Sequence, residues 1–305
     1  MKGLMTIGVG TLLLVVWRFF SLPGLGEFFV WNSAVGALSV GIGYAVAEFA
    51  PQTKVDRFRL VLAGCGLIAF AWLTGNTIYT FEDLAQHAGI ALIVAALLVG
   101  QSWWALGTTA LLTILGHVLV TQFHISHSDP FLLILATVLG IVMFKSPPAL
   151  GWVLGVVFLP LGWWQLSDTG ISFMSNEQLD TSVVTASAML LGIGLLIMSA
   201  IRMLPAWRPL ASIGMHAVSI YVVTMLTARF FGEERSVSFG WTMYSPLSDA
   251  VHLPATSSFS GILANAVSWT NPLIGLAALA LCALAATRRG WGPLEALLER
   301  AYRRL

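Results

Sequence analysis

The amino-acid sequence predicts an all-α membrane protein, a polytopic bundle of about ten transmembrane helices. Of its 305 residues, 57% are hydrophobic and 10% are charged, whereas soluble domains carry about a quarter charged residues. The apolar residues gather into runs close to the length of about 20 residues that a helix needs to cross a bilayer core. This composition excludes an ordinary soluble enzyme, a nucleic-acid-binding protein and a disordered chain.

The apolar runs follow one another along the chain and give the predicted helices in order. The first run, 4–22, follows a single lysine and contains no small-residue cleavage site, which indicates a retained helix rather than a signal peptide. The runs at 86–100 and 129–144 are the shortest. The complete set is 4–22, 29–50, 58–76, 86–100, 103–123, 129–144, 148–166, 181–204, 208–231 and 271–288.

The basic residues orient this predicted bundle. With the N-terminus inside, the outer segments receive only Arg18, Arg229 and Arg235 of the 15 lysines and arginines. Basic residues concentrate on the cytoplasmic side of membrane proteins, so both termini are predicted to lie inside, in a bacterial cytoplasmic membrane. The remaining basic residues, all in inner segments, are Lys2, Lys54, Arg57, Arg59, Lys145, Arg202, Arg208, Arg288, Arg289, Arg300, Arg303 and Arg304.

Residues 1–290 are predicted to form a single transmembrane domain with one long outer loop at 232–270. Long loops in a compact fold are usually lids or binding loops, and Trp241 and Tyr244 make this one a candidate binding loop. The tail 291–305 is predicted to be an amphipathic helix on the cytoplasmic membrane surface. Its leucines share one face, and its charged residues, Glu295 among them, occupy the rest.

Ionisable residues inside the apolar runs are candidate functional groups, because burying them in a membrane costs several kcal/mol unless they are paired or hydrated. His117 lies within 103–123, and His216 lies about eight residues into 208–231. Glu48 lies near the inner end of 29–50. An imidazole can act as a general base or a proton shuttle near neutral pH. For each histidine, a structural hydrogen bond to a neighbouring helix is the alternative.

The densest polar stretch is the turn between the fifth and sixth runs, which contains His124, His127 and Asp129. Two imidazoles and a carboxylate this close can serve as base, orienting group and proton shuttle. His117 precedes His124 by two helical turns, so the two project from nearly the same face. The alternative is a solvated turn. The H-x-x-H-x-D spacing could also hold a metal, but further ligands are not visible nearby, so no metal is expected.

Three stretches resemble known membrane-protein families. Residues 212–221 resemble the late-helix motif of the heparan-glucosaminide N-acetyltransferase-like proteins, in which G-M-N-[AS] is followed by a tyrosine; His216 stands where that family usually has asparagine. Residues 292–295, Gly-Pro-Leu-Glu, resemble the tail motif of the YeiB-like bacterial membrane proteins. The order Gly116-His117, Asp129 and Lys145-Ser146-Pro147 is similar to the L-H…D…R-x-P pattern of the same proteins.

This resemblance implies the transmembrane acyltransferase superfamily, whose architecture is a ten-helix bundle. Its acetyltransferase members use cytoplasmic acyl-CoA and acylate a sugar on the far side of the membrane. The expected donor here is therefore acyl-CoA, and the expected acceptor is an envelope sugar or lipid. Acyl transfer needs a base and an oxyanion-stabilising group. The implied catalytic residues are His117, Asp129, His124 and His127, and the implied substrate-binding residues are Arg18, Arg229, His216, Trp241 and Tyr244.

Two other functions stay open from the sequence. The R-G pair and the histidine that these acyltransferases tend to carry around the first span are absent, and only Arg18 is present there. A non-catalytic subunit or scaffold with a membrane-protein partner fits that departure. A transporter of a small lipid-linked solute would use broken helices, with Pro160 and the Gly192-x-Gly194 pair as candidate breaks.

Overall fold

The computed structural model describes residues 1–19, 25–49, 53–73, 84–122, 130–168, 188–223, 275–288, 290, 292–293 and 295–296. Every regular element within these ranges is a helix, which confirms the predicted all-α class for the described part of the chain. Two helical segments without labels, 217–223 and 275–287, follow the labelled helices. The labelled helices are α1 Lys2–Phe19, α2 Leu25–Phe49, α3 Lys54–Leu73, α4 Leu84–Leu98, α5 Trp103–Gln122, α6 Pro130–Lys145, α7 Pro148–Asp168, α9 Met189–Met203 and α10 Arg208–Met215.

The helices fall on the predicted apolar runs, with one correction. The run 208–231 is not a single helix, because α10 ends at Met215 and a second helix begins at residue 217. His216 between them has φ −111° and ψ 11°, which departs from α-helical geometry. In the part of the chain that the structure describes, no helix combines the length and the apolarity needed to cross a membrane.

The candidate breaks at Pro160 and at Gly192-x-Gly194 do not interrupt their helices. α7 continues through Pro160, and α9 is continuous through both glycines. The glycines serve close packing instead. A Cβ on Gly192 would lie 2.8 Å from Leu159 N on α7, and a Cβ on Gly194 would lie 2.6 Å from Gly36 O on α2. Backbones this close leave no room for a side chain.

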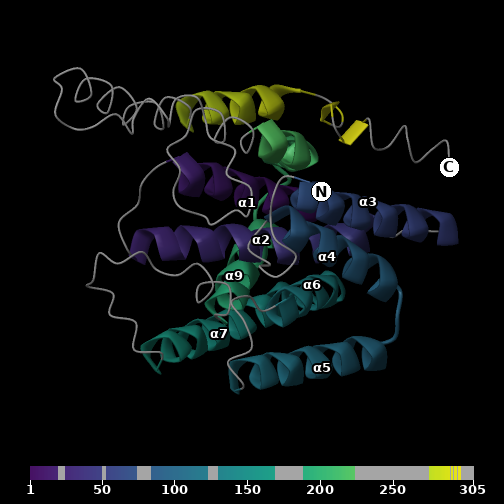
Figure 1. Cartoon of the computed structure of the whole chain (residues 1–305), viewed down its shortest axis with the longest axis vertical. Coiled ribbons are helices and arrows are strands. Elements are labelled where there is room, and N and C mark those ends of the chain that lie inside the picture. The colour runs from purple at the N-terminus through teal and green to yellow at the C-terminus, as the bar shows by residue number, and fades with distance from the viewer. Residues whose placement is uncertain are drawn as a thin grey trace.

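α2 lies at the centre of the bundle and contacts α1, α4, α6 and α9. Its buried residues join those of α6 and α9 in the largest apolar cluster, which includes Leu38, Leu133 and Leu191. Figure 1 shows α5 and α7 toward one edge of the bundle and the helix 275–287, drawn in yellow, at the opposite edge. The core is thus built around α2, while α5, α7 and 275–287 are peripheral.

Several helix ends meet at one end of the bundle, which we call the basic end and define by Lys2, Lys145 and Arg202. Lys145 Nζ lies 3.3 Å from Gln101 O, in the turn between α4 and α5. Arg202 Nη2 lies 2.7 Å from Ser146 O, in the turn between α6 and α7. Lys2, at the start of α1, reaches the end of α9. These contacts place the start of α1, the end of α9 and both turns together, as helices of alternating direction require.

Candidate functional site

Among the predicted catalytic residues, His117 is the one that lies within the described part of the chain. It lies on α5, and its side chain is 7% exposed. The preceding residue, Gly116, packs against α6, because a Cβ there would lie 2.6 Å from Cε1 of Phe131. His117 is therefore a buried imidazole beside the contact between α5 and the first turn of α6.

Most of the other predicted site residues cannot be compared with the structure. Arg18 lies within helix α1, but its side chain is not among those described. The remaining predictions that fall outside the described residues are His124, His127, Asp129, Arg229, Trp241 and Tyr244.

His216 caps the end of α10. Its Nδ1 lies 2.8 Å from Ser212 O, and the side chain is 7% exposed. Because a carbonyl oxygen only accepts hydrogen bonds, Nδ1 is the protonated nitrogen in this contact. α5 and α10 lie on opposite sides of the central helices (Figure 1). The structure therefore does not join His117 and His216 in one site.

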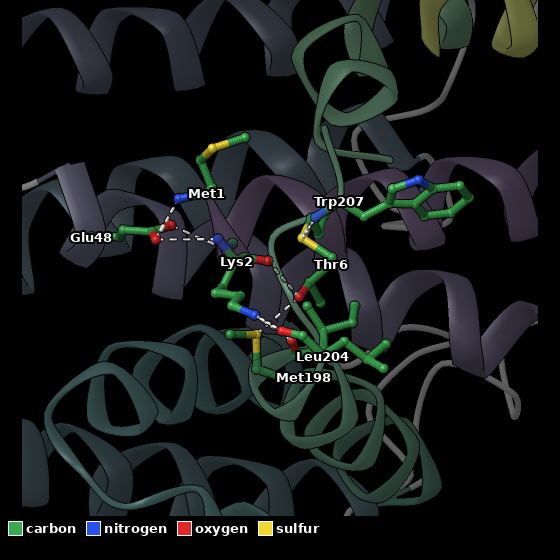
Figure 2. Close-up of polar contacts among 10 residues, drawn as sticks. Met1, Lys2, Thr6, Glu48, Met198, Leu204 and Trp207 are labelled. Carbon is green, nitrogen blue, oxygen red and sulfur yellow. Dashed lines mark hydrogen bonds and ion pairs between the residues drawn. The ribbon is translucent and has the colours of Figure 1, made fainter. Parts of the chain in front are cut away.

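A polar cluster at the basic end ties α1, α2 and α9 together (Figure 2). The Glu48 carboxylate accepts hydrogen bonds from Lys2 N at 3.1 Å and Gly3 N at 3.2 Å, and it also contacts the Met1 amine. It thereby caps the start of α1, where helical N–H groups have no partner within the helix. Lys2 Nζ donates to Ile201 O at 3.0 Å and to Leu204 O.

The other two cations of the basic end also bond to backbone carbonyls. The Arg202 guanidinium, besides its bond to Ser146 O, lies 5.7 Å from the centre of the Tyr44 ring. Lys145 Nζ lies 5.5 Å from the centre of the Trp103 ring. Carbonyls at or just beyond helix C-termini lack intrahelical donors and carry partial negative charge. These cations therefore satisfy helix ends, and sequence analysis assigned them only to membrane orientation.

A second polar cluster lies at the break after α10, and we call it the clasp, formed by Gly292 and Glu295 with Met215, Val218 and Ser219. Glu295 Oε1 accepts from Val218 N at 2.8 Å and Ser219 N at 3.1 Å, and Oε2 accepts from Ser219 Oγ. Gly292 N donates to Met215 O at 3.1 Å. Glu295, which the sequence places on the charged face of the predicted tail helix, therefore bonds to the start of helix 217–223.

The clasp joins two of the stretches that carried the family resemblance, 212–221 and 292–295. A further contact supports it, because Ser212 Oγ lies 2.6 Å from Ala285 O and 2.8 Å from Arg288 O. That hydroxyl shares its one proton between the two carbonyls at the end of helix 275–287. The amphipathic patterns of these two stretches do not indicate that they touch. The only sequence signal for the clasp was that both stretches carry a motif of the family resemblance.

Comparisons with known proteins assign no family. No protein-family model and no solved structure matches the chain. The chain is similar to cytochrome c oxidase subunit 1 of Corynebacterium glutamicum, with 32% identity over 132 residues that cover 39% of this chain and 22% of the relative. For the same subunit of Corynebacterium efficiens, identity is 31% over 132 residues, covering 39% and 23%. The chain thus spans about a fifth of the length of the curated relatives that it matches.

The described residues contain no group of three or more His, Cys, Asp or Glu side chains that could hold a metal ion. The chemistry available in them is that of three buried imidazoles, at His87, His117 and His216, of a cationic helix-capping end and of a carboxylate clasp.

Proposed function

We propose that this chain is a multi-pass membrane protein that transfers an acyl group from a cytoplasmic acyl-CoA to an extracytoplasmic sugar or lipid of the cell envelope. The observation that carries the catalytic part is the burial of His117 on α5, against the first turn of α6. The membrane placement and the acyl-transfer step have separate support.

Exposed apolar side chains support the membrane placement. Soluble monomers rarely expose contiguous apolar patches larger than a few hundred Å². Here large apolar side chains line the outer surfaces of the two peripheral helices α5 and α7, where a lipid environment would cover them. They are Trp103, Trp104, Leu111, Leu112, Ile114, Leu115, Val118 and Leu119 on α5, and Trp152, Val153, Val156, Val157, Leu161 and Trp163 on α7.

Two further observations agree with a membrane location. The basic end collects lysine and arginine residues from three separate chain segments, as the cytoplasmic side of a membrane protein does. The partial similarity to a bacterial membrane protein, cytochrome c oxidase subunit 1, points the same way. We do not extend the oxidase activity to this chain, because the match covers 22% of that relative.

His117 is suited to act as the general base. In acyl transfer, an acceptor hydroxyl oxygen attacks the thioester carbon, the base takes the hydroxyl proton, and the C–S bond breaks to release the CoA thiolate, which then takes up a proton. Asp129, the predicted orienting group, directly precedes α6, and Gly116 contacts Phe131 in the first turn of that helix. The short chain distance from this contact to Asp129 supports the predicted pairing.

The first experiment measures donor binding and transfer with the purified full-length chain in detergent. Titration with acetyl-CoA and longer acyl-CoAs should raise the melting temperature in a saturable manner, because a ligand selective for the folded state stabilises it. His117→Ala should abolish transfer of labelled acetyl groups to envelope extracts. His87→Ala, which removes an imidazole that is 2% exposed on α4, is the matched control and should retain transfer. Full activity in His117→Ala would contradict the proposal.

A second candidate function is transport of a small lipid-linked solute. It is favoured by the interruption at His216, because discontinuous helices are typical of the binding sites of transporters. Uptake by proteoliposomes that contain the chain, without acyl transfer, would support it. If neither activity is present, a non-catalytic membrane subunit is the remaining function, and a co-purifying membrane-protein partner would identify it.

A further inference from the structure

We propose that the clasp is a conformational switch, in which the tail residues Gly292 and Glu295 hold 208–223 as two helices that otherwise join into one. The interrupted state is the one that the structure shows, with α10 ending at Met215 and a new helix beginning at 217. The inference does not depend on acyl transfer.

The hydrogen bonds of the clasp replace those of a continuous helix. In an α-helix, the N–H of residue i donates to the carbonyl of residue i−4. Val218 N would therefore donate to Gly214 O, and Ser219 N would donate to Met215 O. In the structure both donors bond to the Glu295 carboxylate, and Met215 O accepts from Gly292 N. The tail thus occupies groups that are partners of one another in the continuous helix.

The remaining carbonyl is also accounted for. The backbone N–H of His216, at the break, is shared between Gly214 O and Ile213 O, the latter at 3.0 Å. Each state therefore satisfies the same backbone groups, one through the tail and the other within the helix. Leaving such groups buried without a partner is unfavourable, so the segment passes between two satisfied arrangements rather than into a frayed one.

The local packing identifies which half moves. α10 is held against α1, because a Cβ on Gly214 would lie 2.9 Å from Leu4 C and 3.2 Å from Gly8 N. Backbones this close leave α10 no room to tilt, whereas helix 217–223 reaches the core through the side chains of Ile220 and Tyr221. The helix 217–223 is therefore the part that changes direction when the clasp opens, and His216 is the residue about which it turns.

A side chain at Gly292 would displace the Glu295 carboxylate from the closed clasp. A Cβ at this position would lie 2.8 Å from Ser219 Oγ and 3.0 Å from Glu295 Cδ, tighter than almost any real Cβ contact. Gly292→Ala should therefore open the clasp without altering a charge. Glu295→Ala should open it by removing the acceptor. The two variants reach the same state by different routes, which separates the effect of the contact from the effect of the charge.

The test measures a distance across the segment in the full-length chain. Spin labels are placed on cysteines at Arg208, which is exposed, and Val223, which is 43% exposed, after Cys65 and Cys282 are replaced by serine or alanine. A continuous helix separates the two positions by about 22 Å along its axis. Because His216 departs from helical geometry, we expect the interrupted segment to bend and to bring them closer. Double electron–electron resonance should show one shorter distance in the parent and a population at the longer distance in Glu295→Ala and Gly292→Ala.

Two variants serve as controls. Thr287→Ala removes an exposed hydroxyl that bonds only within its own helix, to Leu284 O at 2.8 Å, and should leave the distance unchanged. Adding Val218→Pro to Glu295→Ala should restore the parent distance, because proline is tolerated in the first turn of helix 217–223 but not inside a continuous helix.

Identical distance distributions in the parent, Glu295→Ala and Gly292→Ala would overturn the proposal and leave Glu295 as a structural cap. A longer distance that persists with Val218→Pro would also overturn it. If Glu295→Ala fails to fold, as judged by size-exclusion chromatography and circular dichroism, Gly292→Ala and the milder Glu295→Gln provide the same comparison.

Discussion

Substituting Gly194 by alanine should destabilise the protein strongly, because its Cβ would strike a backbone and not a flexible side chain. The added atom would lie 2.6 Å from Gly36 O, 2.7 Å from Gly36 C and 3.0 Å from Gly36 Cα. Ordinary van der Waals contact begins at 3.4 Å, so α2 and α9 must separate by several tenths of an ångström to admit it. Both sides of the contact are main chain, and no rotamer change can relieve the overlap.

The magnitude follows from two opposing effects. Overpacking a well-packed core costs about 1–3 kcal/mol, and the rigid contact at Gly194 argues for the upper part of that range. Alanine is favoured over glycine inside a helix by about 1 kcal/mol. The expected net loss in the free energy of unfolding is therefore about 2 kcal/mol. For comparison, a Cβ on Gly107 of α5 meets nothing within 4 Å, so Gly107→Ala should stabilise by about 0.5–1 kcal/mol.

The assay compares the two variants in one detergent by thermal and chemical unfolding, with size-exclusion chromatography to confirm that each is monodisperse. Gly194→Ala should melt below the parent, and Gly107→Ala should melt at or above it. Equal melting temperatures for the two variants would refute the close approach of α2 and α9, because helix propensity alone predicts a gain for both.

Two other substitutions test polar contacts. Glu48→Gln should lower the free energy of unfolding by about 1 kcal/mol, because it removes the charge that caps the start of α1; a melting temperature unchanged at low salt would contradict this. Ser212→Ala should cost about 1–2 kcal/mol through loss of the bonds to Ala285 O and Arg288 O, and trypsin should then cleave after Arg288 faster than in the Thr287→Ala control.

The positions of the helices could be predicted from the sequence because each apolar run is long and bounded by polar or turn-forming residues. The break at His216 could not be predicted. No proline marks it, and the groups that stabilise it, Gly292 and Glu295, lie about 76 residues further along the chain. Pro160 is the opposite case, because it suggests a break where α7 is continuous. A proline removes one hydrogen bond, but neighbouring packing can keep the helix continuous.

The candidate site was predictable only in part. His117 was identified because an imidazole inside an apolar run is costly, and the structure confirms its burial. The partners of Glu295 were not predicted, because an amphipathic pattern shows which residues share a helix face but not which tertiary partner meets that face. The helix-capping roles of Lys2 and Arg202 were missed for the same reason, since basic residues near the ends of apolar runs were assigned to orientation alone.

The bond between Lys2 and α9 sets an order of assembly during synthesis. Lys2 Nζ and Ile201 O are separated by 199 residues, which a ribosome adding about 5–20 residues per second takes about 10–40 s to make. Glu48, the other partner of the first helix, emerges long before that. The α1–α2 pair can therefore form early, whereas Lys2 can bond to the end of α9 only after most of the protein has been synthesised. A nascent chain halted before residue 201 would leave that lysine without its final acceptors.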